Sequence, residues 1–130
     1  MKTLYLSFVM VLGLISTTLA ADPIDRIADL FGKGNTQEIA KLFTDNVDMG
    51  IMADLDVYPK AQAIQQLQKF FAQNKPNGSK VLHKVTSNAA FNLAVIAVTT
   101  DKGVFRVSCT LKSVGGNMQL VEVRIEGERK

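Results

Sequence analysis

The sequence predicts a single α+β domain behind a short N-terminal export signal. Apolar residues recur with the period of a helix over residues 22–43 and 59–74, and with a period of two over residues 47–57 and 80–127. Helices that precede a run of hairpin-connected strands are typical of an α+β fold, whereas an α/β fold alternates the two. A domain of this size can bury one core without disulfides, and the sequence contains a single cysteine.

Residues 1–20 have the layout of a secretory signal peptide. A basic residue precedes an apolar run over residues 4–15, and small residues lead up to Ala20. The run is shorter than the roughly 20 apolar residues that a membrane-spanning helix needs. We therefore expect cleavage after Ala20, no membrane span thereafter, and an exported protein, periplasmic or secreted, whose residues 21–130 form one domain.

Two short helices open the domain. Asp22 and Pro23 suit the cap and the first position of a helix, and Gly32 is expected to end it. Asn35 caps the next helix, with Glu38 three residues later as in a capping box. The apolar stripes of the two helices are Ile24, Ile27, Ala28 and Phe31, and then Ile39, Leu42 and Phe43.

One strand over residues 47–57 and a longer helix over residues 59–74 follow. Strict alternation predicts that the strand has one apolar and one polar face. The polar face bears Asp48, Asp54 and Asp56. The helix has a regular apolar stripe that consists of Ala63, Ile64, Leu67, Phe70 and Phe71.

Four more strands complete the domain, over residues 80–87, 91–100, 104–113 and 118–127. Three-residue loops at 101–103 and 115–117 bring apolar side chains opposite one another. On that register Val107 pairs with Ala97 on one side and with Ile125 on the other. The inner face then carries Phe91, Leu93, Val95, Ala97, Val107, Cys109 and Leu111. The outer face carries Ile96, Val98, Arg106, Ser108, Thr110, Glu122, Arg124 and Glu126.

Short stretches spread over almost the whole domain resemble a known family. They are Gly34-Asn35, Leu42-Phe43, Val47-Asp48, Lys60-Ala61-Gln62, Phe70-Phe71, Pro76, His83, residues 103–107, Leu111-Lys112 and residues 122–125. The chain resembles the nuclear-transport-factor-two-like (cystatin-like) superfamily and, within it, a family of small exported Bacteroidota proteins of unknown function. The resemblance implies helices packed in the hollow of a strongly curved antiparallel sheet, which gives a cone-shaped domain. It implies no catalytic residues.

His83, the only histidine, is the candidate for catalysis. It shares strand parity with Val81 and Val85, and a histidine at the mouth of a pocket can act as a general base near neutral pH. An isomerase or hydrolase of this kind needs a carboxylate within hydrogen-bond reach of His83, and the spacing identifies none. The alternative is a rim or core histidine that one hydrogen bond satisfies.

The cysteine and the aspartates do not predict a metal or cofactor site. Cys109 is expected in the core, where burial opposes the thiolate form. One histidine and one inward cysteine cannot supply a tetrahedral zinc site. The three strand aspartates lack the close, oxygen-rich loop that calcium prefers. We therefore expect no metal and no cofactor.

Four residues of the predicted outer face, Arg106, Arg124, Ile96 and Val98, are the candidates for binding a ligand or partner. Two arginines on neighbouring strands can hold carboxylates by bidentate bonds, and apolar side chains mixed with arginine are typical of protein interfaces. We expect this face to pair two copies of the chain. Cross-strand charge pairing within one sheet is the structural alternative.

Composition and the predicted interior favour a non-catalytic function over an enzyme. The 15 Lys and Arg residues outnumber the 12 Asp and Glu only slightly and are interspersed with them, and tryptophan is absent, so we expect no nucleic-acid binding. Almost no polar group faces the predicted interior, whereas a reactive pocket needs convergent polar groups. We expect an exported module that binds a small apolar ligand or a protein partner. The alternatives are the His83 enzyme and an interaction subunit of a cell-envelope assembly.

Overall fold

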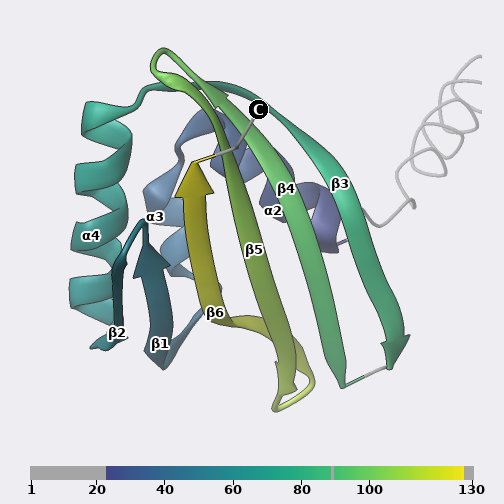
Figure 1. The fold of residues 1–130 in the computed structure, drawn as a ribbon. Helices are drawn as coiled ribbons and strands as arrows, with labels where there is room; N and C mark the ends of the chain where they lie inside the picture. The colour runs from purple at the N-terminus through teal and green to yellow at the C-terminus, as the bar shows by residue number, and fades with distance from the viewer. Residues whose placement is uncertain (1–22, 89, 128–130) are drawn as a thin grey trace, which may run out of the picture.

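The computed structural model describes residues 23–88 and 90–127. The predicted signal peptide and the Asp22 cap lie outside the described residues. The described chain forms three helices and one six-stranded sheet (Figure 1). The elements in chain order are α2 Pro23–Lys33, α3 Thr36–Ala40, β1 Phe43–Ile51, β2 Asp54–Pro59, α4 Lys60–Gln73, β3 Pro76–Asn88, β4 Phe91–Thr100, β5 Gly103–Val114 and β6 Asn117–Gly127.

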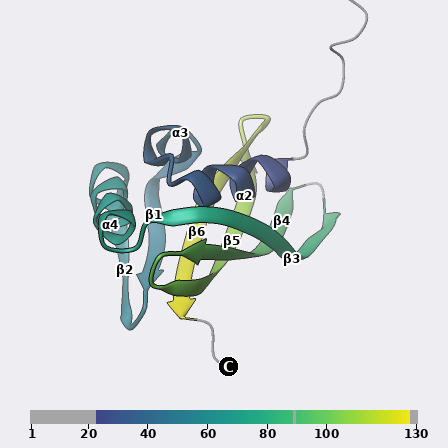
Figure 2. The same cartoon turned by 90° about the horizontal axis from the view of Figure 1, so that it is seen from above.

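The helices lie on one side of the sheet, so the predicted α+β architecture is confirmed. The strand order is β2-β1-β6-β5-β4-β3, and every neighbouring pair is antiparallel except β1 and β6, which run parallel. Figure 1 shows α2 and α3 behind the sheet and α4 beside β2, and Figure 2 shows the sheet bending around the helices. We call the face toward the helices the inner face and the opposite one the outer face. None of the described helices is long and apolar enough to cross a membrane.

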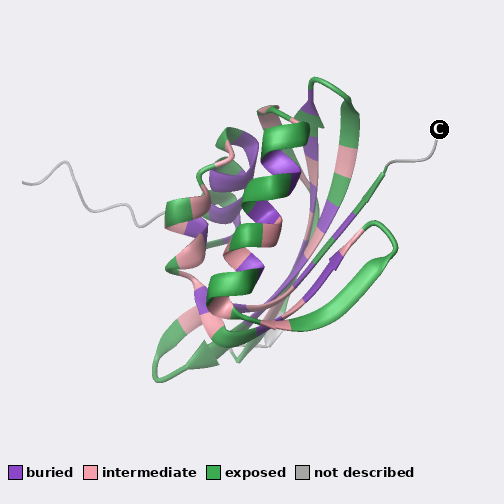
Figure 3. Cartoon of the chain, turned by 90° about the vertical axis from the view of Figure 1, so that its left-hand side faces the viewer, coloured by how far each residue is buried: buried purple, intermediate pink, exposed green. Residues whose placement is uncertain are grey.

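The apolar helix stripes form the core, as their spacing predicts. In Figure 3 the buried positions of the helices face the sheet. The fully or almost fully buried residues of these stripes are Ile24, Ile27, Ala28, Phe31, Ile39, Ala63, Leu67, Phe70 and Phe71. The first helix does not end at Gly32 but at Lys33, because Gly34 takes the left-handed conformation (φ 65°) and its N–H donates to Phe31 O at 3.1 Å. Asn35 caps α3, since its Oδ1 accepts the Glu38 N–H at 3.3 Å.

The predicted single strand over residues 47–57 is wrong, because the chain turns back at Met52 and forms the β1–β2 hairpin. Met52 has a φ of 58°, and its N–H donates to Ile125 O at 2.8 Å. The two-residue turn changes which parity faces inward. Leu55 and Val57 therefore lie on the outer face, 57% and 60% exposed, opposite Gly50 and Asp48.

The three aspartates consequently do not share a face. Asp48 lies opposite Val57 on the outer side, whereas Asp54 and Asp56 lie opposite Ile51 and Met49. These two positions belong to the inner face of the hairpin, because Met49 is fully buried in the core.

The predicted register of β4 is also wrong by one residue. Thr100 lies opposite Gly103, so the loop contains two residues rather than three. The Thr100 hydroxyl fixes this turn: it donates to Gly103 O at 2.8 Å and accepts the Lys102 N–H at 3.0 Å. Ile96 therefore lies opposite Val107, not Ala97.

The shift exchanges the two faces of β4. Ile96 and Val98, expected on the outer face as partner-binding candidates, are fully buried. Phe91 and Leu93, expected in the core, lie outside and are 45% and 47% exposed. The reason is that β4 is apolar at odd and even positions, so the turn and not the alternation decides its register.

The predicted register between β5 and β6 is confirmed for residues 105–110 of β5, whereas the predicted three-residue loop at 115–117 is wrong. Val107 lies opposite Ile125, and Arg106 lies opposite Glu126. The connecting loop again has two residues, Gly115 and Gly116, because Val114 pairs with Asn117. An irregularity after Thr110 adds one residue on the β6 side and restores the predicted pairing.

Candidate functional site

A pocket lies at one end of the sheet, between the start of α2, the end of α3 and the β5–β6 hairpin. We call it the end pocket, and its volume is about 440 Å³. It is lined by Pro23, Arg26, Ile27, Lys41, Leu42, Leu111, Gly116, Asn117, Met118 and Gln119. A volume of this size is in the range of pockets that take small molecules.

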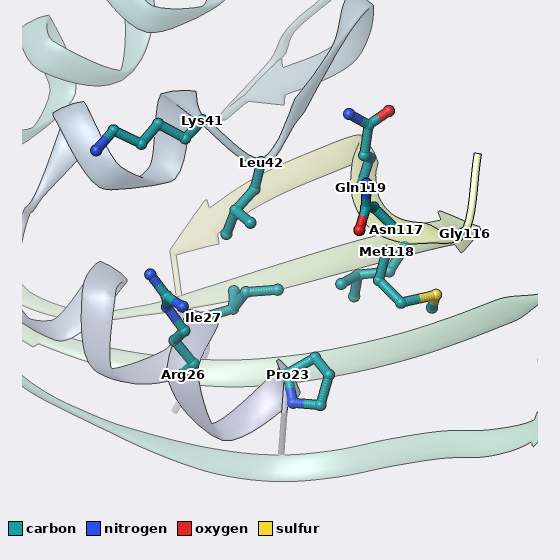
Figure 4. A pocket seen from close by; sticks show the side chains of 10 residues that line it. Pro23, Arg26, Ile27, Lys41, Leu42, Gly116, Asn117, Met118 and Gln119 are labelled. Atoms are coloured by element: carbon teal, nitrogen blue, oxygen red, sulfur yellow. The ribbon is translucent and has the colours of Figure 1, made fainter. Parts of the chain in front are cut away.

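The floor of the end pocket is apolar. Ile27 and Leu111 are 2% and 1% exposed, and Leu42 and Met118 are half-buried above them. The helical period of α2 turns Ile27 toward the sheet, and β5 presents Leu111 on its inner face. Figure 4 shows Ile27 and Leu42 between the two cationic residues on one side and residues 116–119 on the other.

The junction between α3 and β1 fixes the side of the pocket. The Leu120 N–H donates to Leu42 O at 2.6 Å, and Thr44 Oγ1 makes a weaker bond to Leu120 O at 3.3 Å. Phe43 starts β1 opposite Leu120. These bonds tie the chain after α3 to β6, so Leu42 has a fixed place beside Met118.

The rim of the end pocket carries hydrogen-bond donors. Arg26 and Lys41 stand on the helix side, and the amides of Asn117 and Gln119 stand on the hairpin side. None of the described lining residues is acidic. Glu38 lies next to both cations, with its carboxylate 3.1 Å from Lys41 Nζ and 3.8 Å from Arg26 Nη2.

A second, shallower depression lies on the outer face of the sheet. We call it the outer groove; its volume is about 400 Å³. It is lined by Asp48, Phe91, Leu93, Thr110, Val121 and Glu122. The apolar part comes from the odd positions of β4, which the register shift turned outward. Thr110 is almost buried there, and its hydroxyl donates to Glu122 Oε1 at 3.1 Å.

The two predicted arginines flank this outer surface. Arg124 is exposed, and its Nη2 lies 3.2 Å from Glu122 Oε2 on the same strand. Arg106 is exposed opposite Glu126 and has no ion pair among the described residues. The structure therefore places both arginines on the predicted face, but Val95 and Ala97 take the positions opposite Ser108 and Arg106 that were expected for Ile96 and Val98.

His83 does not lie at the end pocket. It sits on the edge strand β3, opposite Val95, and its side chain is exposed. No described carboxylate makes a hydrogen bond or ion pair with it. His83 lines neither the end pocket nor the outer groove, so neither of them brings His83 together with an acid.

Cys109 lies in the core, opposite Ala94 and Val123. Burial raises the pKa of its thiol from 9.0 to about 12, so the thiol stays protonated at physiological pH. Among the described residues, no three His, Cys, Asp or Glu side chains come together to hold a metal ion.

The sequence reasoning missed the end pocket. Ile27 was expected in the core, but nothing in the sequence links Arg26 and Lys41 to the 116–119 turn. Their proximity depends on how the helices dock on the sheet. The pattern of β4 does not identify its outward apolar residues, because both parities of the strand are apolar.

The family described as Domain of unknown function (DUF4783) matches residues 24–126, which include all but the first and last described residues. The chain belongs to the DUF4783 family. The predicted resemblance to a family of unknown function from Bacteroidota is thereby confirmed. No curated protein matches the chain.

Solved DUF4783 structures agree with this fold. A DUF4783 family protein from Bacteroides ovatus is 27% identical, with 86% of this chain and 97% of that chain covered and a TM-score of 0.75. One from Bacteroides uniformis is 24% identical, with 84% and 100% covered and a TM-score of 0.78.

More distant structures show the wider fold class. A domain of unknown function with a cystatin-like fold from Nostoc punctiforme is 10% identical, with 79% of this chain and 71% of that chain covered and a TM-score of 0.64. An NTF-2 like protein of unknown function from Silicibacter pomeroyi is also 10% identical, with 76% and 84% covered and a TM-score of 0.58. The DUF4783 chain thus has the NTF2-like fold that its sequence predicts.

Proposed function

We propose that this DUF4783 protein is an exported, non-catalytic module that binds a small, largely apolar ligand in its end pocket. One observation carries the proposal: a pocket of about 440 Å³ has a buried apolar floor and an exposed polar rim. Pockets of this composition bind small molecules by burying their apolar part and orienting it through a few polar groups. His83, the residue best suited to acid–base chemistry, lies elsewhere.

The test is whether the end pocket, and no other part of the chain, takes up an apolar probe. Octanol is titrated into the ¹⁵N-labelled chain that starts at Ala21, and amide shifts are followed by NMR. We expect the largest shifts at Ile27, Leu42, Leu111 and Met118. Shifts confined to other residues, or none at the solubility limit of octanol, would contradict the proposal.

A substitution that fills the pocket provides the matched control. Met118→Trp adds an aromatic ring to a half-buried lining position and should abolish octanol binding. Leu82→Trp introduces the same ring at a 43% exposed position outside every described pocket lining, and should leave binding unchanged. Thermal unfolding of both variants shows whether each one folds.

Export is the second part of the proposal and rests on the signal-peptide pattern of residues 1–20. The full chain, expressed in a Gram-negative host, should appear outside the cytoplasm with Ala21 as its N-terminus. Ala20→Arg places a large charged residue at the predicted −1 position and should block processing. Recovery of the unprocessed wild-type chain in the cytoplasm would overturn this part.

A second candidate function, self-association through the outer face, is favoured by the exposure of Phe91 and Leu93. These two side chains, with Val121, form the apolar part of the outer groove. Exposed apolar side chains ringed by charged ones are typical of interfaces. The alternation of Arg106 and Arg124 with Glu122 and Glu126 on β5 and β6 gives the face both signs of charge, which suits a second copy of the same surface.

Leu93→Asp tests this candidate, because a new carboxylate in the groove adds a third negative charge beside Asp48 and Glu122. We expect the mass measured by light scattering to fall from dimer to monomer while the protein stays folded. Leu82→Asp, at a similarly exposed position outside the groove, is the control and should leave the dimer intact. A wild-type chain that is monomeric at high micromolar concentration would rule the candidate out.

A further inference from the structure

The charge of the rim specifies the proposed ligand further. The rim of the end pocket has two cations and two amides, while its floor is apolar. From these groups we infer that the end pocket binds a single-chain anionic amphiphile, with its acyl chain over Ile27 and Leu42 and its carboxylate at Arg26. This inference rests on the proposed ligand-binding function and adds the chemical class of the ligand.

Arg26 is the principal contact for the anionic group. Its guanidinium lies 3.8 Å from the Glu38 carboxylate, at the long end of the ion-pair range, whereas Lys41 Nζ is held by Glu38 at 3.1 Å. Arg26 is also 62% exposed, so its fork of N–H donors is free to turn over the pocket. A planar guanidinium binds a carboxylate through two parallel hydrogen bonds.

Lys41 and the hairpin amides complete the polar rim. Lys41 is 70% exposed and has a long, flexible stem, so its ammonium can exchange Glu38 for a bound carboxylate at small cost. Asn117 and Gln119 offer N–H donors from the opposite side of the pocket. Hydrogen-bond donors therefore stand on both walls of the pocket.

The same rim disfavours the other classes of amphiphile. A cationic head group would face two cations, Arg26 and Lys41, and the single carboxylate of Glu38 beside them offsets only one of the two charges. A neutral alcohol would pack its chain on the apolar floor but would make no charge–charge contact with the two cations. Ligand charge is therefore the property by which this pocket discriminates.

The experiment compares octanoate with octanol, which share a chain and differ in charge. Dissociation constants come from NMR titrations of the processed chain at low salt, below the micelle concentration of octanoate. We expect octanoate to bind about five- to tenfold more tightly than octanol, as two exposed charge contacts allow. Added salt should weaken octanoate binding and leave octanol binding unchanged.

Three variants locate the effect. The double variant Arg26→Gln, Lys41→Gln should bind octanoate and octanol equally well. Lys33→Gln, Lys102→Gln makes the same change in net charge at two exposed ion-paired lysines away from the pocket, and should behave like the wild type. Glu38→Gln removes the competing carboxylate and should tighten octanoate binding by about twofold to fivefold.

The outcomes separate the two proposals. Equal affinity of the wild type for octanoate and octanol, both at the end pocket, would overturn the inference about charge and leave the ligand-binding function standing. A preference for octanoate that survives in the Arg26→Gln, Lys41→Gln variant would also overturn the inference. No binding of either probe at the end pocket would overturn both.

Discussion

Gly32 of α2 and Ser79 of β3 are in direct contact where the helix crosses the edge of the sheet. A Cβ atom added to Gly32 would lie 2.6 Å from Ser79 Oγ and 3.0 Å from the carbonyl carbon of Gly78. The Ser79 hydroxyl donates a 2.6 Å hydrogen bond to Ala28 O, one turn earlier in the helix. A missing side chain and one hydroxyl thus set the distance between helix and strand, and with it the place of Ile27 in the pocket floor.

Gly32→Ala should therefore destabilise the protein. Alanine is the better helix former by about 1 kcal/mol, but the added methyl group meets backbone as well as a side chain, so it cannot be accommodated by one rotamer change. Overpacking of this kind costs about 1–3 kcal/mol. Urea unfolding of the variant should show a lower midpoint at an unchanged slope.

Gly78→Ala is the matched control for this substitution. A Cβ atom at Gly78 would meet nothing within 4 Å, although the residue lies next to Ser79. Its free energy of unfolding should stay within about 0.5 kcal/mol of the wild type. A Gly32→Ala variant as stable as Gly78→Ala would show that the helix moves away from β3 without cost.

The helices could be predicted from the sequence because one period fixes both their type and their buried side. Ile24, Ile27 and Phe31 recur at helical spacing, and no other phase would bury all three. The β5–β6 register was predictable for a similar reason, since Val107 and Ile125 are apolar where their neighbours Arg106 and Glu126 are charged.

The register of β4 could not be predicted, because its two faces do not differ in polarity. Leu93 and Val95 alternate with Ala94 and Ile96, and either pair could fill the core. The choice is made by the Thr100 hydroxyl, whose two hydrogen bonds select a two-residue turn. Polarity patterns carry no information about such a bond.

The observed β4 register predicts unequal effects of two alanine substitutions. Ile96→Ala removes a fully buried side chain and should destabilise the protein by about 2–5 kcal/mol. Leu93→Ala acts on a side chain that is 47% exposed and should cost less than about 1 kcal/mol. Chemical denaturation of both variants tests the register. If Leu93→Ala destabilised the protein more than Ile96→Ala does, the register with a three-residue loop at 101–103 would be the correct one.

The buried thiol of Cys109 predicts a pH dependence on the alkaline side. Its pKa is raised to about 12 by burial, from 9.0 for an accessible thiol, so the folded state holds the proton more tightly than the unfolded state does. The stability linked to this group is complete below pH 9 and is lost as the pH rises from 9 toward 12, by about 1.4 kcal/mol per pH unit.

Cys109→Ala isolates this effect from the titration of lysines and tyrosines. The wild type should lose stability more steeply than the variant between pH 9 and pH 10.5, and equally below pH 8. The native thiol should also react with a disulfide reagent only at the rate of unfolding. Parallel pH profiles for the two proteins would mean that the thiol is accessible in the folded state.

The end pocket could not be predicted from the sequence, and the physical reason differs from the one that applies to the register of β4. Arg26 and Lys41 come from two helices, and residues 116–119 come from a turn near the end of the chain. Only tertiary docking brings these segments together, and a short-range pattern contains no information about docking. The sequence indicates only one part of the pocket: the paired glycines at 115 and 116 predict a tight turn.

The turn formed by Gly115 and Gly116 allows the cost of backbone conformation to be tested alone. Gly115 and Gly116 have φ values of 58° and 85°, as a two-residue hairpin turn of the I′ type requires. A Cβ atom at Gly115 would meet nothing within 4 Å, so a substitution there changes only the cost of the left-handed backbone. Gly115→Ala should cost about 1 kcal/mol, whereas Gly115→Asn, which tolerates this conformation, should stay within about 0.5 kcal/mol of the wild type. Thermal unfolding of the two variants makes the comparison. A larger loss for Gly115→Asn than for Gly115→Ala would mean that side-chain volume rather than backbone conformation limits the hairpin beside the end pocket.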